Sequence, residues 1–197
     1  KIATGKIERG VVDLDFSIEK NIKNLSDFKN KDISSITVCI LNRPRHKKII
    51  DNLRNLNVNL KLIEDGDVLG AIYVSDPKYN VDMFLGIGGG PEGVLAASAL
   101  DTYNCHFQGR FIFNNDKDIK EAKSMGIKDL DKKYELNEII KGDSIFCATG
   151  ITKSEVLNGI VLEKNNYKSE TLVTHKNSNL KKIIKKVNLI DEWYLFQ

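Results

Sequence analysis

The residues best suited to chemistry in this chain are concentrated in one glycine-rich segment, Gly-Ile-Gly-Gly-Gly-Pro-Glu-Gly at 86–93. This glycine segment joins an apolar run, residues 81–87, to a helix-like run, residues 93–100. Glycines let a backbone approach a ligand closely, and the N–H groups at a helix start attract anions. Glu92 adds a carboxylate, which would repel a bare phosphate. The combination therefore predicts a site for a phosphate together with its counter-cation.

Two other interpretations fit the glycine segment. Gly88, Gly90 and Gly93 match the dinucleotide fingerprint G-x-G-x-x-G. Against that, Glu92 would place negative charge where a pyrophosphate binds, and Pro91 removes an amide from the cradle. The third interpretation is purely structural: a glycine-rich turn from strand to helix, in which Glu92 complements the helix dipole.

Two further apolar runs, residues 36–41 and 60–63, also end in polar residues. The first is followed by Asn-Arg-Pro-Arg-His at 42–46, and the second by Glu-Asp-Gly-Asp at 64–67. Open α/β sheets bind ligands at the carboxyl ends of their strands, and arginine forks match phosphate oxygens bidentately. Together with the glycine segment, these strand ends predict a pocket for an anionic, hydroxyl-rich ligand.

These segments and Ala-Thr-Gly-Ile-Thr at 148–152 occur in the order and setting of the class II fructose-1,6-bisphosphatases, and the chain resembles this family. These are the bacterial GlpX-type enzymes, some of which also act on sedoheptulose bisphosphate. The similarity runs from residues 10–14 to residues 169–172, and several motifs in register make it more specific than any one of them. It implies a layered α/β sandwich of the sugar-phosphatase type. The implied activity is hydrolysis of the 1-phosphate of fructose 1,6-bisphosphate, in gluconeogenesis and glycerol metabolism.

The resemblance also implies residue roles. The arginine motif would contact the sugar phosphate that is not cleaved, and the Asp-Gly-Asp motif the sugar hydroxyls. Glu92 would be a ligand of a catalytic divalent metal, Mn²⁺ or Mg²⁺. The implied substrate contacts are Arg43, Pro44, Arg45, Asp65, Gly66, Asp67 and Gly89. Arg43 stands where the family often has Lys, and Gly90 where it often has Ala; neither change removes a required chemical group.

Residues 1–197 resemble the C-terminal portion of these enzymes. The family's other metal-binding acids, a catalytic lysine and a substrate-contacting tyrosine precede the matched region, so we expect the catalytic residues in an absent N-terminal portion and no hydrolysis by this chain alone. The complete enzyme would be a cytoplasmic homo-oligomer. Two alternatives remain: a non-catalytic sugar-phosphate-binding or assembly module, and a nucleotide-binding oxidoreductase domain with Asp116 or Asp118 on the ribose.

Composition agrees with a soluble globular protein. The chain has 197 residues, of which 41% are hydrophobic and 29% charged, and its net charge is +3. This is enough to bury a core, as one domain or two small lobes, and is too balanced to indicate nucleic-acid binding. Lysines at 181–186 alternate with isoleucines, which predicts a solvated face. No apolar run approaches the roughly 18 residues of a membrane span, and no signal peptide is evident.

The cysteines and histidines give weak signals. Cys39 and Cys147 lie in apolar runs, which predicts buried thiols in a reducing compartment. No Ser–His–Asp or Cys–His arrangement is apparent, which argues against covalent hydrolase chemistry. His46 adjoins Arg45 and has either a ligand contact or a capping or surface role.

Periodicity and capping signals predict alternating helices and strands, followed by a β-rich end. Ser17 would cap a first helix over 18–28. Further helices are expected at 45–56, 93–102 and 116–125. Strands are expected at 36–41, 60–63, 70–74, 83–87, 107–113, 144–148, 160–162, 171–175 and 182–187.

Overall fold

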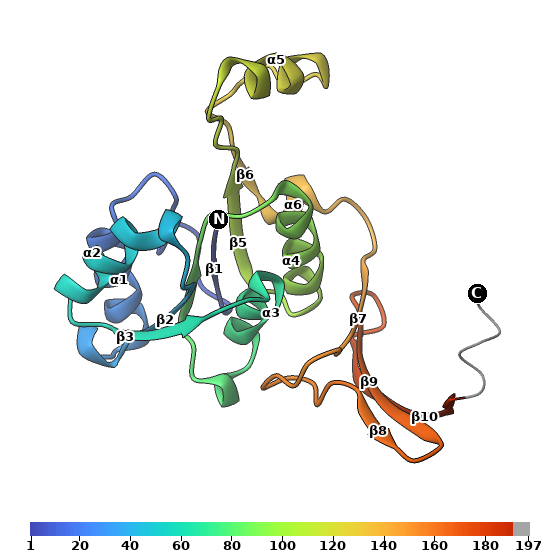
Figure 1. The fold of residues 1–197 in the computed structure, drawn as a ribbon. Coiled ribbons are helices and arrows are strands. Elements are labelled where there is room, and N and C mark those ends of the chain that lie inside the picture. Colours follow the sequence, from blue (N-terminus) through green and yellow to red (C-terminus); the bar gives the residue numbers. More distant parts are fainter. Residues whose placement is uncertain (191–197) are drawn as a thin grey trace. The chain divides into compact units, whose positions relative to one another are not determined.

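Helix and strand patterns alternate through the first part of the chain and build a six-stranded sheet (Figure 1). The structure is a computed structural model and describes residues 1–190. The chain forms two units, Lys1–Lys141 and Gly142–Gln197, called unit 1 and unit 2 below.

Unit 1 contains a mixed sheet of order β3-β2-β4-β1-β5-β6. Strands β2, β3 and β4 pair in parallel, whereas β1 is antiparallel to both β4 and β5. Its strands are β1 (Ile2–Thr4), β2 (Thr37–Leu41), β3 (Asn59–Ile63), β4 (Met83–Leu85), β5 (His106–Arg110) and β6 (Lys133–Glu135). Its helices are α1 (Ile18–Lys29), α2 (Lys47–Asn55), α3 (Asp67–Ile72), α4 (Gly90–Thr102), α5 (Asp116–Ser124) and α6 (Leu136–Ile139). The predicted α/β class is confirmed.

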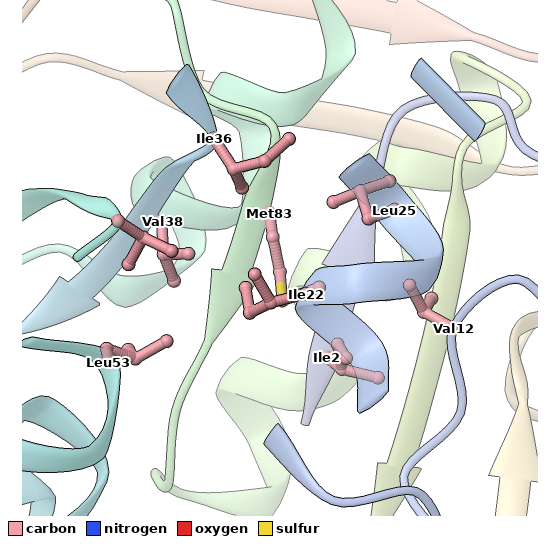
Figure 2. Close-up of a cluster of buried hydrophobic side chains, with 9 residues drawn as sticks. Ile2, Val12, Ile22, Leu25, Ile36, Val38, Leu53 and Met83 are labelled. Carbon is pink, nitrogen blue, oxygen red and sulfur yellow. The ribbon is translucent and has the colours of Figure 1, made fainter. Parts of the chain in front are cut away.

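Helices cover both faces of this sheet. One face packs on α1 and α2 through a fully apolar cluster drawn in Figure 2, with Ile22 and Leu25 from α1 and Leu53 from α2. On the opposite face, Phe84 and Phe107 are buried beneath α3 and α4. As expected, the Ser17 hydroxyl caps α1 by accepting the N–H of Lys20.

One predicted strand is wrong. Residues 70–74 belong to α3 and to the turn that follows it. The segment is apolar throughout because α3 packs against both the sheet and α4, and a buried helix and a buried strand have the same apolar pattern. Gly70 permits this packing, since a Cβ atom there would lie 2.7 Å from Ile63 Cδ1 and 3.1 Å from Phe84.

Helix α5 is set apart from the other elements of unit 1. Figure 1 shows it projecting from the sheet on the two chain segments that follow β5 and precede β6. It buries only Ala122, and the Asn115 side chain caps its first turn. The predicted stop at Gly126 is confirmed by the left-handed φ of +88° at that residue.

Unit 2 is an antiparallel sheet, as the β-rich end predicted. Strand β9 (Asn166–His175) pairs with β7 (Ile145–Thr149), with β8 (Val161–Glu163) and, over ten residues, with β10 (Leu180–Leu189). The lysine-rich residues of β10 are exposed, which agrees with the expected solvated face. Cys39 is buried, but the prediction of a buried thiol at Cys147 is wrong. On β7 the buried side chain is that of Phe146, so the adjacent Cys147 points to the opposite, exposed face.

Candidate functional site

The candidate site lies at one edge of the sheet in unit 1. Because β2, β3 and β4 are parallel neighbours, the segments that follow them emerge at the same edge, which we call the carboxyl edge. Strand β5 also ends there, because β1 is antiparallel to both β4 and β5. The three motifs predicted at strand ends are therefore neighbours in space.

Residues after β2 hold the glycine segment directly. The Arg45 side chain donates from Nε to the backbone oxygen of Ile87 at 2.8 Å. Ile87 in turn donates its N–H to Nε2 of His46 at 2.8 Å, while Nδ1 of His46 lies 2.8 Å from the Leu41 oxygen. This arrangement assigns the proton of a neutral imidazole to Nδ1. His46 is fully buried and its side chain makes no capping bond at the start of α2, so neither a capping nor a surface role is confirmed. Its bonds to Leu41 and Ile87 position the glycine segment.

The motif after β3 reaches the same segment. The Asp67 carboxylate pairs with the Lys1 ammonium, and both side chains are largely buried, at 14% and 7% exposure. A Cβ atom on Gly88 would lie only 2.7 Å from Asp67 Oδ2, so the pair packs directly against the backbone of Gly88. Gly88 is therefore required for the close approach of these charges.

The rest of these two motifs faces solvent. Arg43 is half-buried and precedes a short 3₁₀ turn, Pro44–His46, in which Pro44 and Arg45 are exposed. Asp65 is exposed and accepts the N–H of Gly66, which has a left-handed φ of +78°. Gly66 thereby turns the chain into α3 and sets Asp67 in its first turn.

The glycine segment ends in the start of α4. Gly89 is the N-cap residue and Gly90 the first helical residue, with Pro91 and Glu92 completing the first turn. The exposed Glu92 side chain folds back toward the cap, since a Cβ atom on Gly89 would lie 2.1 Å from Glu92 Oε2. A carboxylate in this position interacts favourably with the helix dipole and faces solvent at the carboxyl edge.

A cavity of about 610 Å³ opens beside the glycine segment. The segment forms one wall, and residues of β5, β6 and α6 form the others, among them Arg110, Phe111 and Tyr134. The rings of Phe111 and Tyr134 meet edge to face, with centroids 5.9 Å apart. Arg45 and Asp65 are not among the lining residues, so the cavity extends from the glycine segment toward β5 and β6.

Sequence reasoning missed a group of charged residues beside this cavity. The Asp15 carboxylate accepts hydrogen bonds from Lys133 and Arg110, which hold its pKa at about 2. Lys133 also pairs with Asp13, and Gln108 donates to Glu135 at 2.9 Å. No signal in the sequence pointed to Arg110, because this residue lies in the middle of the predicted strand 107–113, whereas β5 ends at Arg110 in the structure.

The described residues do not form a metal site by themselves. No group of three or more His, Cys, Asp or Glu residues within 1–190 is arranged to hold a metal ion. Glu92 offers a single carboxylate, whereas Mg²⁺ and Mn²⁺ take about six oxygen ligands. Glu92 therefore fits the role of one ligand among several and not that of a complete site.

The motif at 148–152 lies in unit 2. Thr149 ends β7, and its hydroxyl lies 2.8 Å from that of Thr171 on β9. The N–H of Gly150 bonds to the backbone oxygen of Glu170 at 3.0 Å. These contacts join the end of β7 to β9.

The fold and the carboxyl edge define an α/β protein whose candidate ligand site lies at the ends of parallel strands. The family model "Bacterial fructose-1,6-bisphosphatase, glpX-encoded" matches residues 1–188, and the chain belongs to this family. The resemblance noted in the sequence is confirmed.

Individual relatives agree with this assignment. A Synechocystis protein named D-fructose 1,6-bisphosphatase class 2/sedoheptulose 1,7-bisphosphatase is 32% identical over 96% of this chain and 59% of its own length. A Haemophilus influenzae protein named fructose-1,6-bisphosphatase class 2 is 30% identical over 98% of this chain and 62% of its own length. The chain thus spans about three fifths of the length of these relatives.

The sheet topology argues against the oxidoreductase alternative. A dinucleotide-binding fold places the next parallel strand beside the first, whereas the antiparallel β1 separates β4 from β5 here. Asp116 and Asp118 lie in the first turn of the projecting α5, where Asp118 accepts the N–H of Asn114. Among the described residues, no helix is both long and apolar enough to cross a membrane.

Proposed function

We propose that this chain takes part in the divalent-metal-dependent hydrolysis of the 1-phosphate of fructose 1,6-bisphosphate, which yields fructose 6-phosphate and phosphate. The observation that carries the proposal is the convergence of three motifs at the carboxyl edge. Arg45 bonds to Ile87, Asp67 packs on Gly88, and Glu92 folds back over Gly89. The names of the relatives supply the reaction, and sedoheptulose 1,7-bisphosphate is the second substrate that some of those names contain.

In this proposal each motif has a separate task. Arg43 and Arg45 bind the phosphate that is not cleaved, through charge-assisted hydrogen bonds. Asp65 and Asp67 accept hydrogen bonds from the sugar hydroxyls. Lys1 neutralises Asp67 and so keeps this part of the edge from repelling an anionic substrate.

Glu92 contributes one ligand to the metal site, and the remaining ligands come from outside the described residues. Bound Mn²⁺ or Mg²⁺ would polarise the phosphoryl group and lower the pKa of an attacking water. The chain's own contribution is to fix the Glu92 carboxylate at the start of α4, beside the glycine backbone that approaches the substrate.

The test measures phosphate release from fructose 1,6-bisphosphate with Mn²⁺, using the full-length protein that the gene encodes. Glu92→Gln keeps the shape and loses the charge, so turnover should fall by orders of magnitude while the fold persists. Glu19→Gln is a matched control, because Glu19 is an exposed acid in the first turn of α1. Both variants lose a comparable interaction with the helix dipole. If both variants change turnover equally and only slightly, Glu92 interacts with the helix dipole and is not a metal ligand.

A second candidate function is a sugar-phosphate-binding module without catalysis. It is favoured by the lack of a three-ligand metal group within residues 1–190. The same assay separates the two functions: binding of fructose 1,6-bisphosphate without phosphate release at any Mn²⁺ or Mg²⁺ concentration would establish the module.

A further inference from the structure

Arg110 is the residue of the cavity wall whose bonding is incomplete. One of its terminal nitrogens, Nη2, pairs with Asp15. Its Nε is buried and has no hydrogen-bond partner within residues 1–190. A buried N–H group without a hydrogen-bond partner costs free energy. A guanidinium has five N–H donors. Nε itself is shielded from solvent, but 32% of the Arg110 side chain remains exposed, so a ligand in the cavity can reach the side chain.

The residues around Arg110 favour a ligand that is partly apolar and has an anionic group at one end. The glycine segment presents its backbone on one wall, while Phe111, Tyr134 and Ile139 provide apolar surface on others. Within the charged cluster, Arg110 and Lys133 are balanced by Asp13 and Asp15. The cavity wall itself contains two basic side chains, Lys1 and Arg110, and one acid, Glu138. This lining and the aromatic wall favour a sugar phosphate over a cation.

The spacing of the strands relates Arg110 to Arg45. Adjacent strands lie about 4.8 Å apart, so the ends of β4 and β5, with β1 between them, are roughly 10 Å apart. Arg45 reaches the β4 end through its bond to Ile87, and Arg110 ends β5. A six-carbon sugar with a phosphate at each end has a comparable length, and Ile87 and Arg110 both line the cavity between these points.

We propose that Arg110 is a second phosphate-binding residue, which binds the 1-phosphate of the sugar while Arg45 binds the 6-phosphate. This assignment rests on the proposed function for the identity of the sugar. It makes the cavity between the glycine segment and β5 the part of the site that receives the phosphate to be cleaved. Asp15 acts only as a positioning residue, which orients the guanidinium through Nη2.

A crossed binding experiment on the 197-residue chain tests this assignment. Fructose 1-phosphate, fructose 6-phosphate and inorganic phosphate are titrated separately, and amide shifts of Gly88 and Gly89 are followed by NMR. Arg110→Ala should weaken fructose 1-phosphate binding about 10- to 100-fold and leave fructose 6-phosphate nearly unaffected. Arg45→Ala should do the reverse. If Arg110→Ala leaves all three affinities unchanged, or weakens both sugar phosphates equally, the assignment is wrong.

Two controls separate ligand binding from a structural ion pair. Asp15→Asn removes the partner of Arg110 but keeps the guanidinium, so fructose 1-phosphate affinity should be retained or increased. A loss as large as that in Arg110→Ala would mean that Arg110 acts through Asp15 alone. If Arg110→Ala does not fold, the Nε–H resonance of Arg110 in the wild-type chain provides the readout. It should shift on titration with fructose 1-phosphate, and an unchanged resonance overturns the proposal.

The outcomes also separate this inference from the proposed function. Binding of inorganic phosphate that depends on Arg110, without binding of either sugar phosphate, would support the anion contact and contradict the sugar-bisphosphate function. Binding of both sugar phosphates that depends on Arg45 but not on Arg110 would support the function and overturn the inference. Absence of all binding would overturn both.

Discussion

Unit 1 and unit 2 both contain β-sheets, but they bury them very differently. In unit 1, helices cover both faces and the inner strand β2 is buried at all five positions. In unit 2, nine of the ten residues of β10 are exposed, including Ile184, Val187 and Leu189. The carboxyl edge belongs to the covered sheet, where packing fixes the strand ends that carry Arg45, Asp67 and Arg110. Buried packing therefore positions the candidate site, whereas backbone pairing alone defines much of unit 2.

The largest expected difference between the units concerns core packing. Phe84 is fully buried beside Gly70, so Phe84→Ala should lower the free energy of unfolding of unit 1 by about 3–5 kcal/mol. Leu162 on β8 is 74% exposed, and Leu162→Ala should change stability by less than about 0.5 kcal/mol. Urea unfolding followed by circular dichroism measures both. Similar losses would mean that unit 2 has a core comparable to that of unit 1.

The next largest effect on stability is expected for a buried carboxylate in unit 1, that of Asp82. Asp82 accepts the N–H of Thr37 at 3.0 Å and pairs with Lys29 and Lys31 at 2.8 and 2.9 Å. Burial raises the pKa of Asp82, but these hydrogen bonds more than offset it and hold the pKa below its ordinary value. Asp82→Ala leaves the Thr37 N–H without its partner and should cost about 1–3 kcal/mol.

The pH dependence of this effect has a definite sign. Because the folded pKa of Asp82 is depressed, its stabilisation is fully present above the ordinary aspartate pKa of 3.8 and is lost as the pH falls through the lower, folded value. Unfolding curves of wild type and Asp82→Ala should therefore differ most at pH 7 and approach each other in strong acid. A difference that persists unchanged below pH 2 would contradict this account.

Glu170 is the corresponding carboxylate of unit 2. Hydrogen bonds from the backbone and side chain of Asn158, both at 2.9 Å, and from Lys185 lower its pKa from 4.5 to about 2. The NMR shift of the Asn158 amide should consequently titrate near pH 2. The loop before β8 should remain bound to Glu170 on β9 down to that pH. A midpoint near 4.5 would show that Glu170 does not hold this loop.

The smallest change in stability is expected in the glycine segment. Gly89→Ala forces the exposed Glu92 carboxylate away, because the new Cβ would lie 2.1 Å from Oε2, yet only a flexible side chain has to move. Stability should change by less than about 0.5 kcal/mol, while turnover in the assay above should fall. Gly90→Ala is the matched control, since its Cβ meets only Phe111 at 3.5 Å. Equal activities of the two variants would contradict a role for the position of Glu92.

The sequence by itself determined much of this protein. Apolar periodicity located α1, β2, β3 and the β-rich end, because the apolar positions of each element follow the side that it buries. Motifs in register indicated the family, and the placement of polar residues after strands predicted that Arg45, Asp67 and the glycine segment would meet. The sequence did not distinguish the buried helix α3 from a strand, because both bury apolar side chains on all sides.

Only the tertiary structure decided which partners these residues have. It assigned His46 to the support of Ile87 and Asp67 to Lys1, although 41 and 66 positions separate these pairs in the sequence. It also brought Arg110 to the carboxyl edge through the antiparallel strand β1 and left its Nε without a partner within residues 1–190. The physical reason is that strand order and direction arise from the packing of the whole sheet, whereas local sequence specifies only each strand and the residues at its ends.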